Sequence, residues 1–103
     1  MLSLVVILTV RNDSIEAFRT FEHHAARVMA RYGGAIERTV VVASEPESAT
    51  FREVHLVTFP DDSAFARYRD DAELRTYSHL RDASVVNTEV LAGAPGPKYG
   101  MRE

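Results

Sequence analysis

The sequence predicts an α+β fold in which the order strand, helix, strand occurs twice, the βαββαβ order of a ferredoxin-like domain. Four segments rich in β-branched and aromatic residues support this prediction: 2–11, 35–44, 51–60 and 85–92. Between the two strands of each strand-helix-strand half, apolar residues recur at three- and four-residue intervals, as in amphipathic helices. Because both crossovers should be right-handed, we expect both helices on one face of a four-stranded antiparallel sheet, with the first and third strands central.

Length and composition indicate a single domain. The chain has 103 residues, of which 46% are hydrophobic and 26% are charged, the balance of an ordinary globular protein. We expect residues 1–95 to form the domain. Residues 96–103 contain several Gly and Pro residues, and we expect them to form a flexible C-terminal tail.

Charge and residue types exclude several classes of function. The net charge is -3 and no run of Lys or Arg forms a basic stripe, so we expect no nucleic-acid partner. The absence of cysteine rules out thiolate chemistry, and the apolar run 4–10 is too short to span a membrane, which favours a cytoplasmic protein. His23 and His24 are adjacent and point about 100° apart on a helix, so we expect no metal and no cofactor.

The ends of the two helices are marked by capping residues. Asp13 and Glu16 have the spacing of a capping box, and the glycines at 33–34 are expected to end the first helix. Residues 61–63 supply N-cap candidates for the second helix. Its apolar stripe is interrupted near residues 70–71, where we expect a break or kink.

Strand alternation predicts which residues share a face of the sheet. In the first strand the all-apolar row of 2, 4, 6, 8 and 10 suits the helices. We expect the other face to collect Val5, Ile7, Thr9, Glu53, His55, Val57, Phe59, Asn87, Glu89 and Leu91. A half-apolar face of this size predicts a homodimer closed sheet against sheet, with a cavity of mixed polarity for a small hydrophobic ligand.

Three runs carry a resemblance to a known superfamily: YGGAIERTVVV, EVHLVTFPDDSAFARYRDDAEL and NTEVLAG. Together they resemble the dimeric α+β barrel superfamily, which includes antibiotic-biosynthesis-monooxygenase-like proteins and many small proteins of unknown function. The resemblance covers almost the whole chain, and residues 57–70 are its most diagnostic part. It implies that cofactor-free oxygenation of polycyclic phenols, haem degradation, muconolactone-type isomerisation, polyketide cyclisation or simple ligand binding is available to this fold.

Two departures narrow these alternatives. The haem-degrading branch typically carries a Trp, and this chain has none. The plant polyketide cyclases carry a His two residues upstream of the position that matches His55, where this chain has Glu53.

His55 and Glu53 are the candidate catalytic residues. Their Cβ atoms should lie roughly 7 Å apart on one strand, and an imidazole near a carboxylate in a desolvated cavity is a usable general base. A structural histidine whose hydrogen bonds are satisfied by its neighbours is a slightly simpler explanation of the same residue. The candidate substrate-binding residues are Thr9, Arg11, Phe59, Tyr68, Asn87 and Glu89.

Two functional hypotheses remain open at this point. The first is a cofactor-independent oxygenase, isomerase or cyclase that acts on a small aromatic or polyketide-like substrate. The alternative is a non-catalytic homodimer that binds a small ligand or has a structural role. A closed cavity with His55 pointing into it would favour the enzyme.

Overall fold

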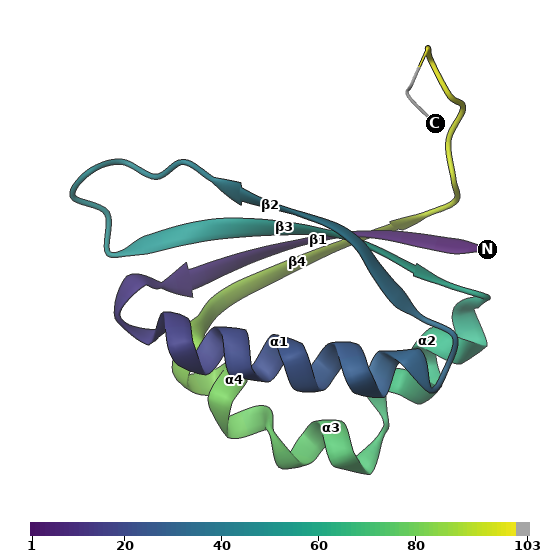
Figure 1. Ribbon diagram of the computed structural model, residues 1–103, viewed down its shortest axis with the longest axis horizontal. Coiled ribbons are helices and arrows are strands. Elements are labelled where there is room, and N and C mark those ends of the chain that lie inside the picture. Colours follow the sequence, from purple (N-terminus) through teal and green to yellow (C-terminus); the bar gives the residue numbers. More distant parts are fainter. Residues whose placement is uncertain (101–103) are drawn as a thin grey trace.

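The computed structural model describes residues 1–100, in which four antiparallel strands form one sheet and every helix packs on the same face of it (Figure 1). The strands are β1 (Leu2–Arg11), β2 (Ala35–Val42), β3 (Thr50–Phe59) and β4 (Val85–Gly93). The helices are η1 (Asn12–Ser14), α1 (Ile15–Ala30), α2 (Asp62–Arg69), α3 (Ala72–Thr76) and α4 (Ser78–Ser84). The strand order is β2-β3-β1-β4, which confirms the ferredoxin-like prediction with β1 and β3 central.

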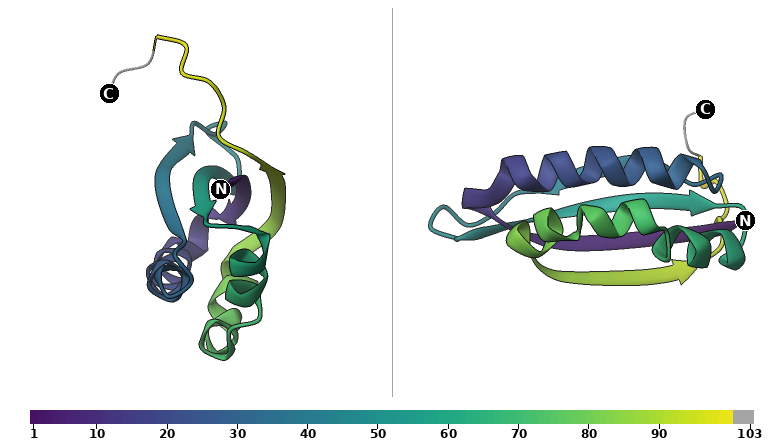
Figure 2. Two further views of the ribbon diagram at one scale, coloured as in Figure 1. Left: turned by 90° about the vertical axis from the view of Figure 1, so that its right-hand side faces the viewer. Right: turned by 90° about the horizontal axis from the view of Figure 1, so that it is seen from below.

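The helices form two rows beneath the sheet. Figure 2 shows α1 in one row and α2, α3 and α4 in the other, both running along the strands. The second row is broken where expected, because the Asp71 side chain accepts hydrogen bonds from the first backbone amides of α3 and starts a new helix. A further break at Tyr77 separates α3 from α4, and the apolar stripe of the sequence does not predict it.

The N-terminus of α2 follows the prediction, whereas that of α1 does not. Asp61 caps α2 by accepting a hydrogen bond from the amide of Ala64 at 2.8 Å. The expected capping box of Asp13 and Glu16 is absent, because residues 12–14 form a 3₁₀ turn and the N-cap position of α1 falls on Ser14. The short turn shifts the start of α1 by one residue relative to the pattern.

The glycines end α1 as predicted. The amide of Gly34 donates to the carbonyl of Met29 at 3.0 Å and that of Gly33 to Ala30 at 3.1 Å, the pairing of a Schellman motif. Gly33 has φ +73°, a conformation that favours glycine. A side chain at Gly34 would collide with the ring of Phe59, so this turn lets α1 pass close to β3.

The register of β3 corrects the predicted assignment of faces. His55 is opposite Val6 and Glu53 is opposite Leu8, so both lie on the covered face, defined here as the face beneath the helices. The expectation that Glu53, His55, Val57 and Phe59 share a face with Val5, Ile7 and Thr9 is wrong. The odd-numbered row of β3 contains two Phe residues and Val57, and it buries more apolar surface than the Val54 and Leu56 row. Because Glu53 and His55 belong to this odd-numbered row, its burial places them on the covered face as well.

The remaining surface of the sheet is called the open face. It carries Val5, Ile7 and Thr9 as predicted, now together with Val54 and Leu56 of β3. The β4 residues on this face are Asn87, Glu89 and Leu91, also as predicted. All the helices within residues 1–100 lie on the other side of the sheet (Figure 2).

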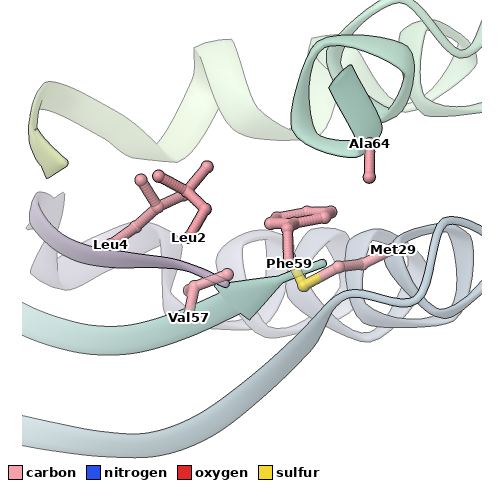
Figure 3. Packing of buried hydrophobic residues seen from close by; sticks show 6 residues of the cluster. All are labelled: Leu2, Leu4, Met29, Val57, Phe59 and Ala64. Carbon is pink, nitrogen blue, oxygen red and sulfur yellow. The ribbon is translucent and has the colours of Figure 1, made fainter. Parts of the chain in front are cut away.

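The core lies between the covered face and the helices. Figure 3 shows the cluster of Leu2, Leu4, Met29, Val57, Phe59 and Ala64. Phe59 is its centre, with its ring centroid 5.3 Å from that of Phe65 and 5.5 Å from that of Tyr68. A second cluster, under the N-terminal half of α1, contains Leu8, Val10, Phe18 and Phe51.

After β4 the chain continues without regular secondary structure. Residues 94–100 are exposed and form neither helix nor strand. The predicted flexible tail spans 96–103, of which 101–103 lie outside the described residues, and its flexibility stays a prediction. None of the helices within residues 1–100 combines the length and apolarity required to cross a membrane.

Candidate functional site

A cavity of about 310 Å³ lies between the covered face and the helices, within one chain. This volume is at the lower end of the range of small-molecule sites, roughly 300–1,000 Å³. All four strands and the helices α1 to α4 contribute to its wall, which is mostly aliphatic and aromatic. The polar side chains that interrupt the wall away from its mouth are Glu22, His55, Tyr68, Arg81 and Thr88. The exposed residues of the wall, Arg69, Arg75, Ser78 and Val90, mark the mouth.

His55 pairs with the buried Glu53 at the wall of this cavity. Its Nε2 lies 2.7 Å from Oε2 of Glu53, and the two side chains are 5% and 3% exposed. A carboxylate only accepts hydrogen bonds, so the Nε2 atom carries the proton in this pair. The other oxygen of Glu53 accepts a hydrogen bond from Nη1 of Arg19 at 2.5 Å. His55 lines the cavity, and Glu53 lies behind it.

Glu22 approaches the other side of the His55 ring. Its Oε2 is 3.7 Å from Nδ1 of His55, which is too far for a direct hydrogen bond but close enough for the carboxylate to attract the ring when the ring is protonated. Burial raises the pKa of Glu22, and His55 and Arg81 oppose that rise by favouring the carboxylate. His55 therefore stands between two carboxyl groups, one fixed by Arg19 and one facing the cavity.

Tyr68 and Arg81 complete the polar part of the wall. Burial raises the pKa of the Tyr68 phenol, with a further rise from the nearby Glu22 charge, so this phenol stays protonated. The Nη2 atom of Arg81 donates a hydrogen bond to Oγ1 of Thr88 at 2.5 Å, which ties α4 to β4. The wall thus offers a carboxyl group, an imidazole, a phenol and a guanidinium.

A group of polar contacts outside the cavity holds α3 against α1. Glu73 pairs with Arg27 at 2.5 Å and also with Arg31. The hydroxyl of Tyr32 donates to Asp71 at 2.5 Å. These exposed pairs are individually weak, yet they join the two helix rows beside the cavity mouth.

The adjacent histidines of α1 have separate surroundings. The His24 ring stacks on Tyr77 with centroids 3.7 Å apart, and His23 is exposed. Within residues 1–100, no three His, Asp or Glu side chains are grouped in a way that could hold a metal ion.

The structure brings together only some of the residues selected from the sequence. His55, Phe59 and Tyr68 line the cavity, and Glu53 contacts it through His55. Thr9, Asn87 and Glu89 lie on the open face. Arg11 is exposed at the end of β1, opposite Thr50.

Sequence reasoning missed Glu22, Arg81 and Thr88. A signal for Glu22 was present, since it lies four residues after Phe18 and three before Ala25, inside the apolar stripe of α1. Arg81 likewise lies three residues before the buried Ser84 on the inner side of α4. A charged residue inside an apolar stripe is worth testing as a site residue for this reason.

No protein-family model matches the chain, and no curated protein sequence does. Solved structures match it well. SnoaB, a cofactor-independent oxygenase from Streptomyces nogalater, has a TM-score of 0.65 at 15% identity, and the match covers 94% of each chain. A putative antibiotic biosynthesis monooxygenase from Nitrosomonas europaea has a TM-score of 0.66 at 17% identity, covering 92% of this chain and 98% of its own.

A protein of unknown function from Rhodopseudomonas palustris has a TM-score of 0.75 at 18% identity, covering 94% of this chain and 84% of its own. Likeness at these identities concerns the fold. It confirms the fold that the resemblance implies.

Proposed function

We propose that this chain is an enzyme that removes a proton from a small, mostly apolar aromatic or polyketide-like substrate, as a cofactor-independent oxygenase, isomerase or cyclase. The observation that supports this most is the buried His55, which lines a cavity of small-molecule size and is held by Glu53 from behind. The shared fold with SnoaB, a cofactor-independent oxygenase, is consistent with the same class of chemistry.

The proposed chemical role of His55 follows from its hydrogen bond. Glu53 holds the tautomer with the proton on Nε2, which leaves Nδ1 free to accept a proton. In the proposed step an O–H or C–H bond of the substrate breaks and its proton moves to Nδ1. The imidazolium that forms is stabilised by Glu53, whose charge is in turn supported by Arg19.

This function is tested in two stages. A thermal-shift screen of phenols and polyketide-like lactones first supplies a ligand, and turnover of that ligand is then followed by liquid chromatography and mass spectrometry. We expect His55→Gln to lose about 10²–10⁴-fold in rate, the usual contribution of a general base. The matched control is His79→Gln, because His79 is exposed on α4 and outside the cavity wall. Equal rates for His55→Gln and the parent would refute the role of His55.

A non-catalytic binding protein is the second candidate. It is favoured by the fact that both ring nitrogens of His55 face carboxyl groups, as in a structural ion network. In that case ligands from the screen should bind without being consumed, and His55→Gln should change the free energy of unfolding more than it changes affinity.

The open face supports the proposal of a homodimer. Leu56 and Leu91 flank Val5 in one row across three strands, and they are 43% and 54% exposed. Val40 is 49% exposed in the next row, beside Val54. Burying such rows stabilises an interface by about 25 cal/mol per Å² of apolar surface.

Sedimentation equilibrium at micromolar concentration should therefore give twice the chain mass, and Leu56→Asp should shift the protein to monomer. The matched control is Glu16→Ala, an exposed side chain of α1, which lies on the other side of the sheet. A parent protein that sediments as a monomer would contradict this assembly.

A further inference from the structure

We propose that Arg81 forms an oxyanion subsite in the cavity, where its guanidinium binds the oxygen of a phenolic or enolic substrate as that oxygen becomes negatively charged. This inference rests on the proposed function, because it names the substrate class of the same site. It also assigns a role to a residue that the sequence patterns did not single out.

The position of Arg81 is the first support. The residue belongs to α4 and lines the same cavity as His55. Its Nη2 is fixed by the hydrogen bond to Thr88 of β4 at 2.5 Å, so the guanidinium is held at the wall by two elements of the fold. A guanidinium has five N–H donors, and fixing one of them leaves the others available to a ligand.

The second support comes from a comparison of which arginines form ion pairs with carboxylates. Arg19, Arg27, Arg31 and Arg75 each form an ion pair with a carboxylate within 4 Å. Six other arginines within residues 1–100 form none at that distance, and of these Arg81 is the one that is partly buried, whereas Arg11, Arg38, Arg52, Arg67 and Arg69 are exposed. A cation that is partly removed from water and has no carboxylate in contact is a natural site for an anionic oxygen.

The charges around the cavity fit a substrate that enters neutral and ionises there. The titratable groups on the wall are Glu22 from α1, His55 from β3, Tyr68 from α2 and Arg81 itself, with Arg69 and Arg75 at the mouth. Proton transfer from the substrate to Nδ1 of His55 creates an imidazolium beside Glu53 and leaves a negative charge on the substrate oxygen. Arg81 would stabilise the negative charge on the substrate oxygen, as Glu53 stabilises the imidazolium.

Glu22 is the group that competes with such an oxyanion for Arg81. Burial raises the pKa of Glu22, which reduces the cost of protonating it when an anion binds nearby. The rest of the wall is mostly aliphatic and aromatic, which suits an apolar ring system. The inferred substrate class is therefore an apolar, ring-bearing molecule with one acidic hydroxyl.

The test uses 4-nitrophenol, whose phenol and phenolate forms absorb at different wavelengths. Titration of the protein-bound probe gives its apparent pKa in the parent and in Arg81→Gln, Arg81→Lys and Thr88→Val. We expect the parent to bind phenolate at least about tenfold more tightly than Arg81→Gln does, because charge-assisted hydrogen bonds are lost. Arg81→Lys should recover part of the difference, and Thr88→Val, which frees the guanidinium, should lose part of it.

Two controls isolate the charge at this position. Arg67→Gln removes an exposed arginine of α2 that lies outside the cavity wall and should bind phenolate like the parent. The neutral probe 4-nitroanisole should bind the parent and Arg81→Gln equally. Circular dichroism checks that each variant is folded, and if Arg81→Gln fails this check, Thr88→Val and Arg81→Lys carry the comparison.

Each outcome has a defined meaning. Equal phenolate affinity for the parent and all variants at positions 81 and 88 would overturn the subsite, as would tighter binding of 4-nitrobenzoate than of the phenolate. Because the measurement needs no turnover, it is separate from the His55→Gln rate assay. Loss of phenolate binding in Arg81→Gln supports the subsite even where that assay shows no catalysis.

Discussion

The two faces of the sheet distribute polar and apolar side chains in opposite ways. The covered face buries Glu53 and His55, which are only 3% and 4% exposed, beside a cavity. The open face leaves Leu56 and Leu91 exposed by 43% and 54%. Burying ionisable groups and exposing apolar rows both cost free energy unless a partner compensates them. A polar interior beside a cavity is typical of a small-molecule site, and an exposed apolar row is typical of a protein interface, so the two faces indicate separate functions.

The largest expected effect compares the packing of the two faces. Phe59→Ala should lower the free energy of unfolding by about 3–5 kcal/mol, because the ring is fully buried at the centre of the core. Leu56→Ala on the open face should change it by less than about 1 kcal/mol at a concentration where the chain is monomeric. Urea denaturation of both variants measures the difference. Similar losses would mean that the two faces are equally buried in the isolated chain.

The second prediction concerns charge on the two faces. Glu53→Gln should cost about 1–3 kcal/mol of unfolding free energy, because it leaves Arg19 and His55 without their carboxylate. The lower part of this range applies if solvent screens Arg19, which is 41% exposed. Glu89→Gln is the matched change on the open face, where the side chain is exposed, and we expect an effect below about 0.5 kcal/mol. Chemical denaturation at neutral pH distinguishes the two.

The smallest expected effects are two changes of stability with pH that have opposite signs. Burial raises the pKa of Glu22 above its ordinary value of 4.5, so the folded protein binds this proton more tightly than the unfolded chain does. Its contribution to stability therefore decreases as pH rises from below 4.5 through the folded pKa. Glu22→Gln should remove this decrease, so the variant gains stability relative to the parent over that pH interval.

Glu73 should have the opposite effect on the pH dependence of stability. Its hydrogen bonds with Arg27 and Arg31 lower its pKa from 4.5, so its stabilising contribution is present above 4.5 and is lost as pH falls through the folded pKa. Glu73→Gln should therefore lose stability relative to the parent at neutral pH and regain parity in acid. Unfolding measured at several pH values tests both residues, and a shared sign would contradict the difference in their surroundings.

Local features of the sequence were sufficient for most of the secondary structure. The glycines at 33–34 and the caps at Asp61 and Asp71 act through hydrogen bonds to neighbouring residues, so their effect can be read from a few positions. The capping box of Asp13 and Glu16 is absent because residues 12–14 form a 3₁₀ turn in its place. Boundaries of this kind depend on small free-energy differences.

The sequence by itself determined the order of the elements, the central strands, and the fact that Glu53 and His55 lie on the same side of β3. Side chains alternate along every strand, so two residues that are two positions apart lie on the same side of it. This alternation does not determine which side faces the helices. That choice was decided by the register of β3 with β1 and by the larger apolar area of Phe51, Val57 and Phe59.

The candidate site was decided by tertiary structure alone. Glu22, His55, Tyr68 and Arg81 come from α1, β3, α2 and α4, and no spacing in the sequence links them. Their proximity depends on how two rows of helices pack on one twisted sheet. Packing distances of this kind are set by many side chains at once, so the sequence determined the residues while only the folded chain determined that they share one cavity.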